Sequence, residues 1–268
     1  MLEIKEISKT FNAGTVNEKT ALNGVSLTLN DGDFVTVIGG NGAGKSTLLN
    51  AVAGVWPVDQ GSISIDGVDV TYLPEYKRAR YIGRVFQDPM MGTAATMQIE
   101  ENLALAKRRG KARCLRPGIT AAEREEYKQL LKGLNLGLED RMTTKVGLLS
   151  GGQRQALTLL MATLQKPKLL LLDEHTAALD PATAEKVLAL TKSIVAEKKI
   201  TCLMVTHNMH QALELGNRTL MMDAGRIVFD VKGAARSKMT VDDLLEKFRE
   251  NAGKTLDNDR ILLSKVEK

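Results

Sequence analysis

Residues 39–47 read Gly39-Gly40-Asn41-Gly42-Ala43-Gly44-Lys45-Ser46-Thr47, and they directly follow the apolar run Phe34-Val35-Thr36-Val37-Ile38. The nine residues contain the pattern G-x-x-x-x-G-K-[ST], placed between a predicted strand and a predicted helix. Glycines at three positions let backbone N–H groups turn inward around phosphates, and the helix that begins at Lys45 adds the positive end of its dipole. The stretch therefore predicts a phosphate-binding loop in an α/β protein.

Within this loop the side chains have separate predicted tasks. Lys45 is expected to neutralise the β and γ phosphates of a nucleoside triphosphate, and the Ser46 hydroxyl is expected to ligate Mg²⁺. The competing interpretation is a glycine-rich turn that contains a Lys-Ser pair by chance. The residues assigned to ATP binding in the loop are Gly39, Asn41, Gly42, Ala43, Gly44, Lys45, Ser46 and Thr47.

An acidic pair ends a second apolar run, Leu169-Leu170-Leu171-Leu172-Asp173-Glu174. A buried strand of this kind delivers Asp173 to the edge of a sheet, where the carboxylate can hold Mg²⁺ through water. Glu174 follows immediately and is expected to act as the general base for the attacking water. Such pairs also occur at strand ends for structural reasons, so the interpretation depends on the phosphate loop upstream.

Two further polar residues follow predicted strands and are expected at the same edge. His207 comes after the strand at 200–205 and can donate to the γ-phosphate, although an isolated histidine there is more often a capping or structural group. Gln87 ends the strand at 82–86 and can reach Mg²⁺ or the attacking water. Neither residue indicates a function by itself, and both assignments depend on the neighbouring motifs.

A second glycine-rich motif, Leu149-Ser150-Gly151-Gly152-Gln153-Arg154-Gln155, opens a predicted helix. Its Ser hydroxyl and glycine N–H groups form an anion site at a helix N-terminus. A compact sheet has one nucleotide pocket, which the first loop already supplies. The second motif therefore suggests a site for the nucleotide of another copy of the chain. A Ser N-cap followed by a tight turn is the alternative, and it accounts for Ser150 only.

Apolar periodicity organises the chain as an α/β core interrupted by helices. We predict that residues 1–239 form one ATPase domain with a helical insertion at about 88–165, and that residues 240–268 form a C-terminal helix and tail. A hairpin is predicted at 61–70, turning at Asp66-Gly67. The other predicted strands are 2–8, 21–38, 82–86, 168–172, 200–205, 218–223 and 226–230, and the predicted helices are 45–54, 97–107, 121–134, 151–165, 182–196 and 241–250.

Composition is that of a globular protein, with 268 residues, 43% hydrophobic residues and a formal net charge of +5. No apolar run approaches the roughly 18 residues of a membrane span. The N-terminus predicts no signal peptide, and Cys114 and Cys202 have no metal-site spacing, so a cytoplasmic location is expected. An acid-free basic stretch suggests contact with anionic lipid or an acidic partner, or a solvated loop, and nucleic acid is not expected. Its residues are Lys107, Arg108, Arg109, Lys111, Arg113 and Arg116.

These motifs together resemble those of the ATP-binding-cassette (ABC) ATPases, from about residue 2 to residue 230 or beyond. Residues 149–155 are similar to the family's signature motif, which is highly specific, 39–47 to Walker A and 169–174 to Walker B. Gln87 matches the Q-loop, Ala178-Leu179-Asp180 the D-loop and His207 the switch histidine. Phe11 falls where the family has an adenine-stacking aromatic, usually tyrosine; as an unassigned residue it fits a core aromatic.

The resemblance implies a P-loop NTPase (RecA-like) core with an antiparallel β subdomain and an inserted α-helical subdomain. It also implies a head-to-tail homodimer around two ATPs, each held by the Lys45 loop of one copy and by the signature motif of the other. Asp180 would link the two sites. The signature residues acting in trans would be Ser150, Gly151, Gly152 and Gln153. His175 departs from the family, because most relatives have proline or alanine after the catalytic acid.

By the same resemblance the chain would serve separate transmembrane permease subunits at the cytoplasmic face of the membrane. The expected docking surface is near Gln87 and the run Asp88-Pro89-Met90-Met91. Subunits of this size are typical of bacterial importers, which implies an extracytoplasmic substrate-binding protein as an indirect partner, and the pattern resembles a tryptophan/tyrosine uptake branch. Alternatives are an exporter or lipid-trafficking ATPase and a soluble ABC protein. A P-loop kinase would leave residues 149–155 unexplained.

Overall fold

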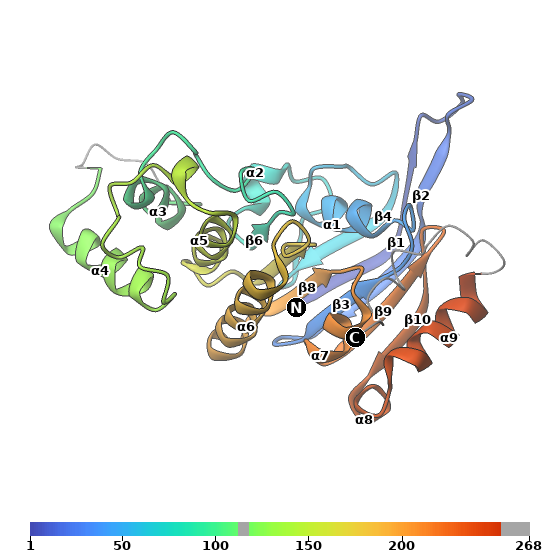
Figure 1. The fold of residues 1–268 in the computed structure, drawn as a ribbon. Helices are drawn as coiled ribbons and strands as arrows, with labels where there is room; N and C mark the ends of the chain where they lie inside the picture. Colours follow the sequence, from blue (N-terminus) through green and yellow to red (C-terminus); the bar gives the residue numbers. More distant parts are fainter. Residues whose placement is uncertain (112–117, 253–268) are drawn as a thin grey trace. The chain divides into compact units, whose positions relative to one another are not determined.

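The computed structural model describes residues 1–111 and 118–252, which form two compact units (Figure 1). The first unit combines Met1–Arg78 with the chain from Ile200 onward, and the second is Ala79–Lys199. Arg113, Cys114, Arg116 and the predicted tail after residue 252 lie outside the described residues. Among the described helices, none is both long enough and apolar enough to cross a membrane.

An antiparallel sheet in the order β2-β1-β4-β5 makes up one part of the first unit. Alternate residues of β1 face inward, so Leu2 and Ile4 are each 1% exposed and pair with Ile65 and Ile63 of β4. The predicted hairpin at Asp66-Gly67 is confirmed, because both residues have positive φ and join β4 to β5. The bounds are β1 Leu2–Phe11, β2 Lys19–Leu29, β4 Gln60–Ile65 and β5 Val68–Asp69.

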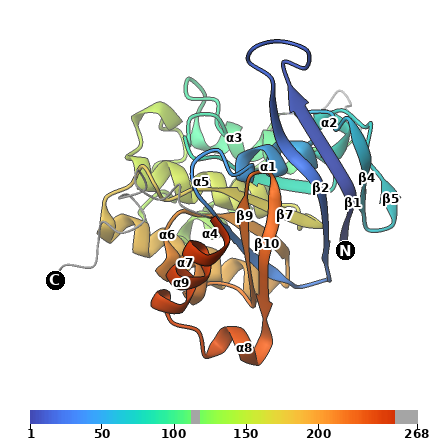
Figure 2. The same cartoon turned by 90° about the vertical axis from the view of Figure 1, so that its right-hand side faces the viewer.

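The same unit contains parallel strands, with β3 paired to β8 on one side and to β9 on the other. All five residues of β3 are buried, as its continuous apolar sequence predicts. Strand β10 pairs antiparallel with β9, and helices α7 and α9 pack beside these strands (Figure 2). The bounds are β3 Phe34–Ile38, β8 Thr201–Val205, β9 Arg218–Asp223, β10 Arg226–Lys232, α1 Lys45–Ala53, α2 Glu75–Arg78, α7 Met209–Glu214, α8 Gly233–Ser237 and α9 Val241–Ala252.

The predicted strand region 21–38 is divided in the structure. A turn at residues 30–33 separates β2 from β3, and the two strands belong to different sheets. Asp33 N donates to Asn30 O at 3.1 Å, Asn30 N donates to the Asp33 carboxylate at 2.8 Å, and Gly32 has φ 81°. Polar turn formers with a glycine outweigh the apolar periodicity on either side.

The second unit pairs β6 in parallel with β7, and helix α5 packs against β6 on one side and α6 on another. Its core cluster joins α3, α4 and α5 through Leu103, Tyr127 and Leu157, all 0% exposed. Gly83 of β6 permits close packing, since a Cβ there would lie 2.5 Å from Ala162 O of α5. The bounds are β6 Ile82–Val85, β7 Leu169–Asp173, α3 Ile99–Lys107, α4 Ala121–Lys132, the 3₁₀ helix η1 Val146–Leu148, α5 Gly151–Thr163 and α6 Pro181–Lys198.

Candidate functional site

The predicted phosphate loop lies in the first unit between β3 and α1. Gly39 has φ 153° and Gly44, the N-cap of α1, has φ 101°. A Cβ at Gly39 would lie 2.3 Å from Met222 O, and a Cβ at Gly44 would lie 2.5 Å from Ala21 O. Because backbone oxygens occupy both positions, the glycines allow a close backbone approach that other residues would block. The result is a backbone cradle that opens a nine-residue helix.

Lys45 is the first residue of α1 and is 7% exposed. Its ammonium donates to Gly39 O at 2.7 Å and to Gly40 O at 2.9 Å, which fixes the positive charge at the loop itself. Asn41 and Gly42 are exposed, and so is Ser46 in the first turn of the helix. A buried cation, exposed loop residues and a helix N-terminus together suit a polyphosphate.

Phe11 ends β1 in the same unit and is partly buried. Its ring lies edge-on to Trp56, with 5.4 Å between the centroids and 85° between the planes. Lys9 Nζ lies 5.7 Å from the Phe11 centroid. Phe11 is therefore part of a small aromatic pair that remains open to solvent, and adenine stacking by its ring stays a prediction.

His207 also belongs to the first unit, between β8 and α7, and is partly buried. The residue after it, Asn208, caps α7 by accepting from Gln211 N at 3.1 Å. The Thr206 hydroxyl donates to Gln211 Oε1 at 3.0 Å. Both chain neighbours of His207 thus bond to Gln211 of the helix that follows, Thr206 to its side chain and Asn208 to its backbone N–H.

The acidic pair lies in the second unit, where β7 ends. Leu170, Leu171 and Leu172 are 0% exposed, whereas Asp173 and Glu174 are partly exposed. Glu174 has φ 43°, a left-handed conformation that a glutamate rarely adopts. The chain therefore turns sharply directly after the strand, and such strained positions cluster at functional sites.

His175, the departure from the family pattern, is 1% exposed. Its Nε2 lies 3.0 Å from Thr191 Oγ1, and the Thr191 hydroxyl donates to Val187 O at 2.8 Å. Since that hydroxyl proton is used, Nε2 carries the imidazole proton and donates to Thr191. Burial lowers the His175 pKa to about 4, so the ring is neutral near pH 7. The hydrogen bond between His175 and Thr191 therefore holds the segment after Glu174 against α6.

The signature-like motif forms a capping box at the start of α5. Ser150 Oγ accepts from Gln153 N at 3.3 Å, and Gln153 Oε1 accepts from Ser150 N at 3.2 Å. This reciprocal pair fixes the backbone of the first turn, where helix N–H groups have no intrahelical acceptor. Helix α5 has 13 residues, and binding of an anion at its N-terminus stays a prediction.

The same motif packs against the D-loop region within the second unit. Gly152 is buried, and a Cβ there would lie 2.1 Å from Thr183 Cγ2 in the first turn of α6. A Cβ at Gly151 would lie 3.3 Å from Leu179 Cδ2. Asp180 caps α6 by accepting from Thr183 N at 3.0 Å, and the Thr183 hydrogen bonds lower the Asp180 pKa. The structure thus brings together two motifs that are distant in sequence.

We expect Gly152→Ala to destabilise the protein by about 1–3 kcal/mol, since the added methyl overlaps Thr183. Thr183→Ala removes the colliding atom and should restore the unfolding midpoint in the double variant. Gly151→Ala is the matched control and should leave stability near wild type. If the double variant recovers stability but not ATP turnover, Gly152 is required at the nucleotide as well as by packing. Equal destabilisation by both glycine substitutions would contradict the packing account.

Gln87 lies just beyond β6 and is exposed. The residue before it is held by the signature helix, because Gln155 Nε2 donates to Phe86 O at 3.1 Å. Gln155 is 0% exposed, so this bond is shielded from water. The position from which Gln87 leaves the sheet is therefore set by a residue of the 149–155 motif.

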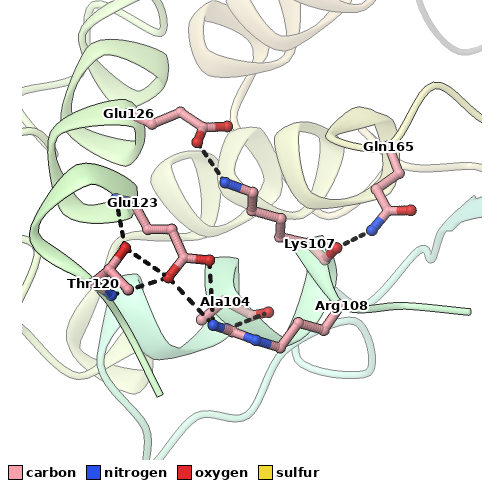
Figure 3. Close-up of polar contacts among 7 residues, drawn as sticks. All are labelled: Ala104, Lys107, Arg108, Thr120, Glu123, Glu126 and Gln165. Atoms are coloured by element: carbon pink, nitrogen blue, oxygen red, sulfur yellow. Dashed lines mark hydrogen bonds and ion pairs between the residues drawn. The ribbon is translucent and has the colours of Figure 1, made fainter. Parts of the chain in front are cut away.

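Part of the basic stretch is used inside the second unit (Figure 3). Lys107 pairs with Glu126, and Arg108 donates to Glu123 at 3.2 Å and to Ala104 O at 3.1 Å. Arg109 donates to Ala162 O at 3.2 Å, and burial lowers its pKa. These contacts connect α3 to α4 and α5, so Lys107, Arg108 and Arg109 are held within the unit and do not form the solvated loop that was one of the expectations.

The predicted site residues divide between the two units. The first unit carries Phe11, the loop at 39–47 and His207, and the second carries Gln87, Asp173, Glu174, residues 150–153 and Asp180. A family model described as "ABC transporter" matches residues 22–177, which include the loop, the signature motif and the acidic pair. The chain belongs to the ABC transporter family. It is an ATP-binding subunit and an ATPase, and the predicted P-loop α/β fold is confirmed.

Several proteins with sequences similar to this one are named as ATP-binding proteins of transporters. The chain is 47% identical over 252 residues to a tyrosine transport ATP-binding protein of Clostridioides difficile, covering 92% of this chain and 98% of that protein. It is 39% identical to a methionine import ATP-binding protein of Rhizobium johnstonii, covering 78% of this chain but 56% of that protein. A dimeric ATP-binding cassette solved in a post-hydrolysis state with ADP and Pi has a TM-score of 0.74 and 30% identity, covering 87% of this chain and 98% of that one.

Two buried arginines of the cassette were not predicted from the sequence. Arg78 is 2% exposed, and its guanidinium donates to Ala51 O and Val52 O at 2.8 and 2.9 Å, at the C-terminal end of the loop helix α1. A Cβ at Gly54 would lie 2.6 Å from Arg78 Nε. Arg236 makes similar contacts with α7. A cation at a helix C-terminus is favourable, but an isolated arginine in a sequence does not show which helix it reaches.

Proposed function

We propose that the chain hydrolyses ATP as a head-to-tail homodimer, with each ATP between the Lys45 loop of one copy and Ser150 and Gly152 of the other. The observation that carries the nucleotide-binding part of this proposal is the glycine cradle, where Gly39 and Gly44 admit backbone and no side chain. The capping box at Ser150, which presents a second helix N-terminus, supports a second phosphate contact. The dimeric state of the solved relative also supports it.

The proposed roles follow from the chemistry of each group. Glu174 takes a proton from the attacking water, and His207 donates to the γ-phosphate. Gly151 and Gln153 complete the trans contact, Phe11 stacks on adenine, and Asp180 joins the two sites across the dimer. The cis contacts to ATP come from Gly39, Asn41, Gly42, Ala43, Gly44, Lys45, Ser46 and Thr47.

Mg²⁺ is the proposed companion of the nucleotide, held by Ser46, Gln87 and Asp173. Their hydroxyl, amide and carboxylate oxygens are the hard ligands that Mg²⁺ prefers beside phosphates and water. Ser46 and Gln87 are exposed and Asp173 is partly exposed, so the donor set fits a hydrated cation. When bound, the ion neutralises charge that develops on the phosphates.

The ATPase domain is proposed to span residues 1–239 with the insertion at 88–165, followed by the segment 240–268. The partner is a pair of transmembrane permease subunits, which would hold the chain at the cytoplasmic face of the membrane. Three apolar side chains of the second unit, Met90, Met91 and Leu105, are 39%, 70% and 57% exposed and suit an incoming partner helix. An extracytoplasmic binding protein would deliver the solute.

Import of an amino acid is the transport reaction that the relatives support, with tyrosine as the first candidate. The test is uptake of labelled tyrosine by source cells that lack the chain, complemented with wild type or with Lys45→Ala. Wild type is expected to restore uptake and Lys45→Ala to leave it at the deletion level. Loss of methionine uptake alone would assign a different amino acid. Unchanged uptake of every amino acid supplied would contradict the import proposal.

A further inference from the structure

The helix after His207 is short and is held at both ends. Helix α7 has six residues, fewer than an isolated helix needs to be stable. At its start Asn208 N donates to the Thr206 hydroxyl at 3.1 Å, and Gln211 contacts both residues. The direction in which the chain leaves His207 therefore depends on where α7 is fixed.

A buried guanidinium fixes the other end of α7. Arg236 on α8 is 9% exposed, and its Nη2 donates to Ala212 O at 2.8 Å, to Leu213 O at 3.0 Å and to Leu215 O at 2.5 Å. Its Nε donates to Thr219 Oγ1 at 2.9 Å. These carbonyls are among those that a helix C-terminus leaves without intrahelical donors. Burying a charge is costly unless such bonds satisfy it, so the contact is a specific one.

Two of the groups that Arg236 contacts, Ala212 O and the Thr219 hydroxyl, are also bonded to β3, the strand that leads into the phosphate loop. The Thr36 hydroxyl of β3 donates to Ala212 O at 2.9 Å and lies 3.0 Å from the Thr219 hydroxyl, with both threonines 0% exposed. Arg236 thus completes a buried polar network that spans β3, β9 and the end of α7. Removing one polar group of this network leaves its buried partners without a hydrogen bond. Because that is costly, the network has one preferred arrangement.

Helix α9 packs next to α7 and against β9 and β10 (Figure 2). Leu244 and Phe248 are 0% and 3% exposed and belong to one apolar cluster with Ile38 and Met209. Ile38 directly precedes the phosphate loop, and Met209 is the first residue of α7. The segment after β10 therefore contacts the supports of both the loop and His207.

We propose that Arg236 is a positioning residue for His207, acting through α7, and that the C-terminal segment is thereby part of the hydrolytic machinery. This inference rests on the proposed role of His207 in ATP hydrolysis. Without the guanidinium, Leu213 O and Leu215 O lose this donor, and Ala212 O keeps only the threonine hydroxyls. Helix α7 then moves toward solvent or tilts, and the imidazole leaves its hydrolytic position. The phosphate loop has its own support in Arg78, so ATP binding is retained.

The first experiment compares Arg236→Lys with wild type in the full chain, with Mg·ATP. A lysine keeps the charge but not the planar fork that reaches several carbonyls. We expect kcat to fall about tenfold or more with the Kd for ATP within about twofold, the signature of a lost transition-state contact. The control is Arg218→Lys, which weakens the pair with Asp230 in the same unit and should leave kcat unchanged. An equal loss in both variants, or unchanged kcat in Arg236→Lys, would overturn the proposal.

A double-mutant cycle separates this inference from the function on which it rests. If Arg236 acts through His207, adding Arg236→Lys to His207→Ala should cause no further loss of turnover. The same loss in both backgrounds contradicts the positioning role. Full turnover by His207→Ala alone contradicts instead the proposed role of His207.

A spectroscopic readout does not depend on activity. The sequence contains three histidines, so imidazole-labelled protein gives three sets of NMR signals, assigned by single His→Gln variants. Arg236→Lys is expected to move the His207 signals and to leave those of His175 in place. If Arg236→Lys does not fold, Thr219→Val keeps the guanidinium but removes the hydroxyl that accepts from Arg236 Nε and contacts Thr36 and Ala212 O, and it should give a smaller shift of the same signals. Unmoved His207 signals in a folded variant refute the inference.

Discussion

Glu174→Gln is expected to bind Mg·ATP, to hold two copies together and to lower ATP turnover by about 10²–10⁴-fold, the usual contribution of a general base. Glutamine has the shape of glutamate but takes no proton from water. Loss of the negative charge also removes repulsion of the nucleotide phosphates, so binding is kept or strengthened. The complex should therefore stop before hydrolysis and appear as an ATP-dependent dimer in size-exclusion chromatography.

The control for Glu174→Gln is Glu185→Gln, an exposed position on α6 of the same unit. It should hydrolyse ATP at the wild-type rate and show no ATP-stabilised dimer. Residue 174 has a positive φ in the wild-type chain, and since glutamine has the shape of glutamate, we expect the same backbone strain in both variants. Undiminished hydrolysis by Glu174→Gln would remove this carboxylate from the role of base.

The second large effect is complementation between two inactive variants. Lys45→Ala lacks the phosphate-binding cation, and Ser150→Arg places a bulky cation at the N-terminus of α5, so each variant alone should show almost no turnover. In a mixed dimer one site combines both defects and the other combines Lys45 of the Ser150→Arg chain with Ser150 of the Lys45→Ala chain. That second site is intact if the motif acts in trans.

Mixing equal amounts should therefore restore turnover, up to about a quarter of the wild-type sites if copies exchange at random. The control mixes Lys45→Ala with a second loop variant, Ser46→Ala, which leaves every site of the mixed dimer defective. Turnover that rises only in the first mixture supports the head-to-tail arrangement. An inactive first mixture in which mixed dimers have been demonstrated would argue for a site formed within one chain.

Local patterns made much of the fold predictable. The helices expected at 45–54, 97–107, 121–134, 151–165 and 182–196 correspond to α1, α3, α4, α5 and α6, since apolar spacing and cap residues lie within the helix itself. The turn at 30–33 was missed because apolar residues continue on both sides of it. Helices α2 and α8 were missed because each is only about one turn long, and tertiary contacts fix them.

The site residues that could be predicted from the sequence are those that belong to contiguous motifs. Residues 39–47 specify their own turn geometry, so their glycine requirement could be inferred before the structure. The contact of Gly152 with Thr183, the bond from Gln155 to Phe86 O and the Arg236 network join residues far apart in sequence. Nothing local marks such residues, because their roles arise only when the elements pack.

The contact between Gly152 and Thr183 also limits how this protein can change over generations. A methyl at 152 collides with Thr183, so a larger side chain there becomes acceptable only after position 183 has shrunk to serine or alanine. In the other direction, position 183 can lose its methyl group, as in serine, but loss of the hydroxyl removes a hydrogen bond to Asp180, and expansion is blocked by the helix that it faces. Substitutions at position 183 of α6 are therefore tolerated toward smaller side chains and not toward larger ones. The constraint comes from residues 149–155, which lie outside α6.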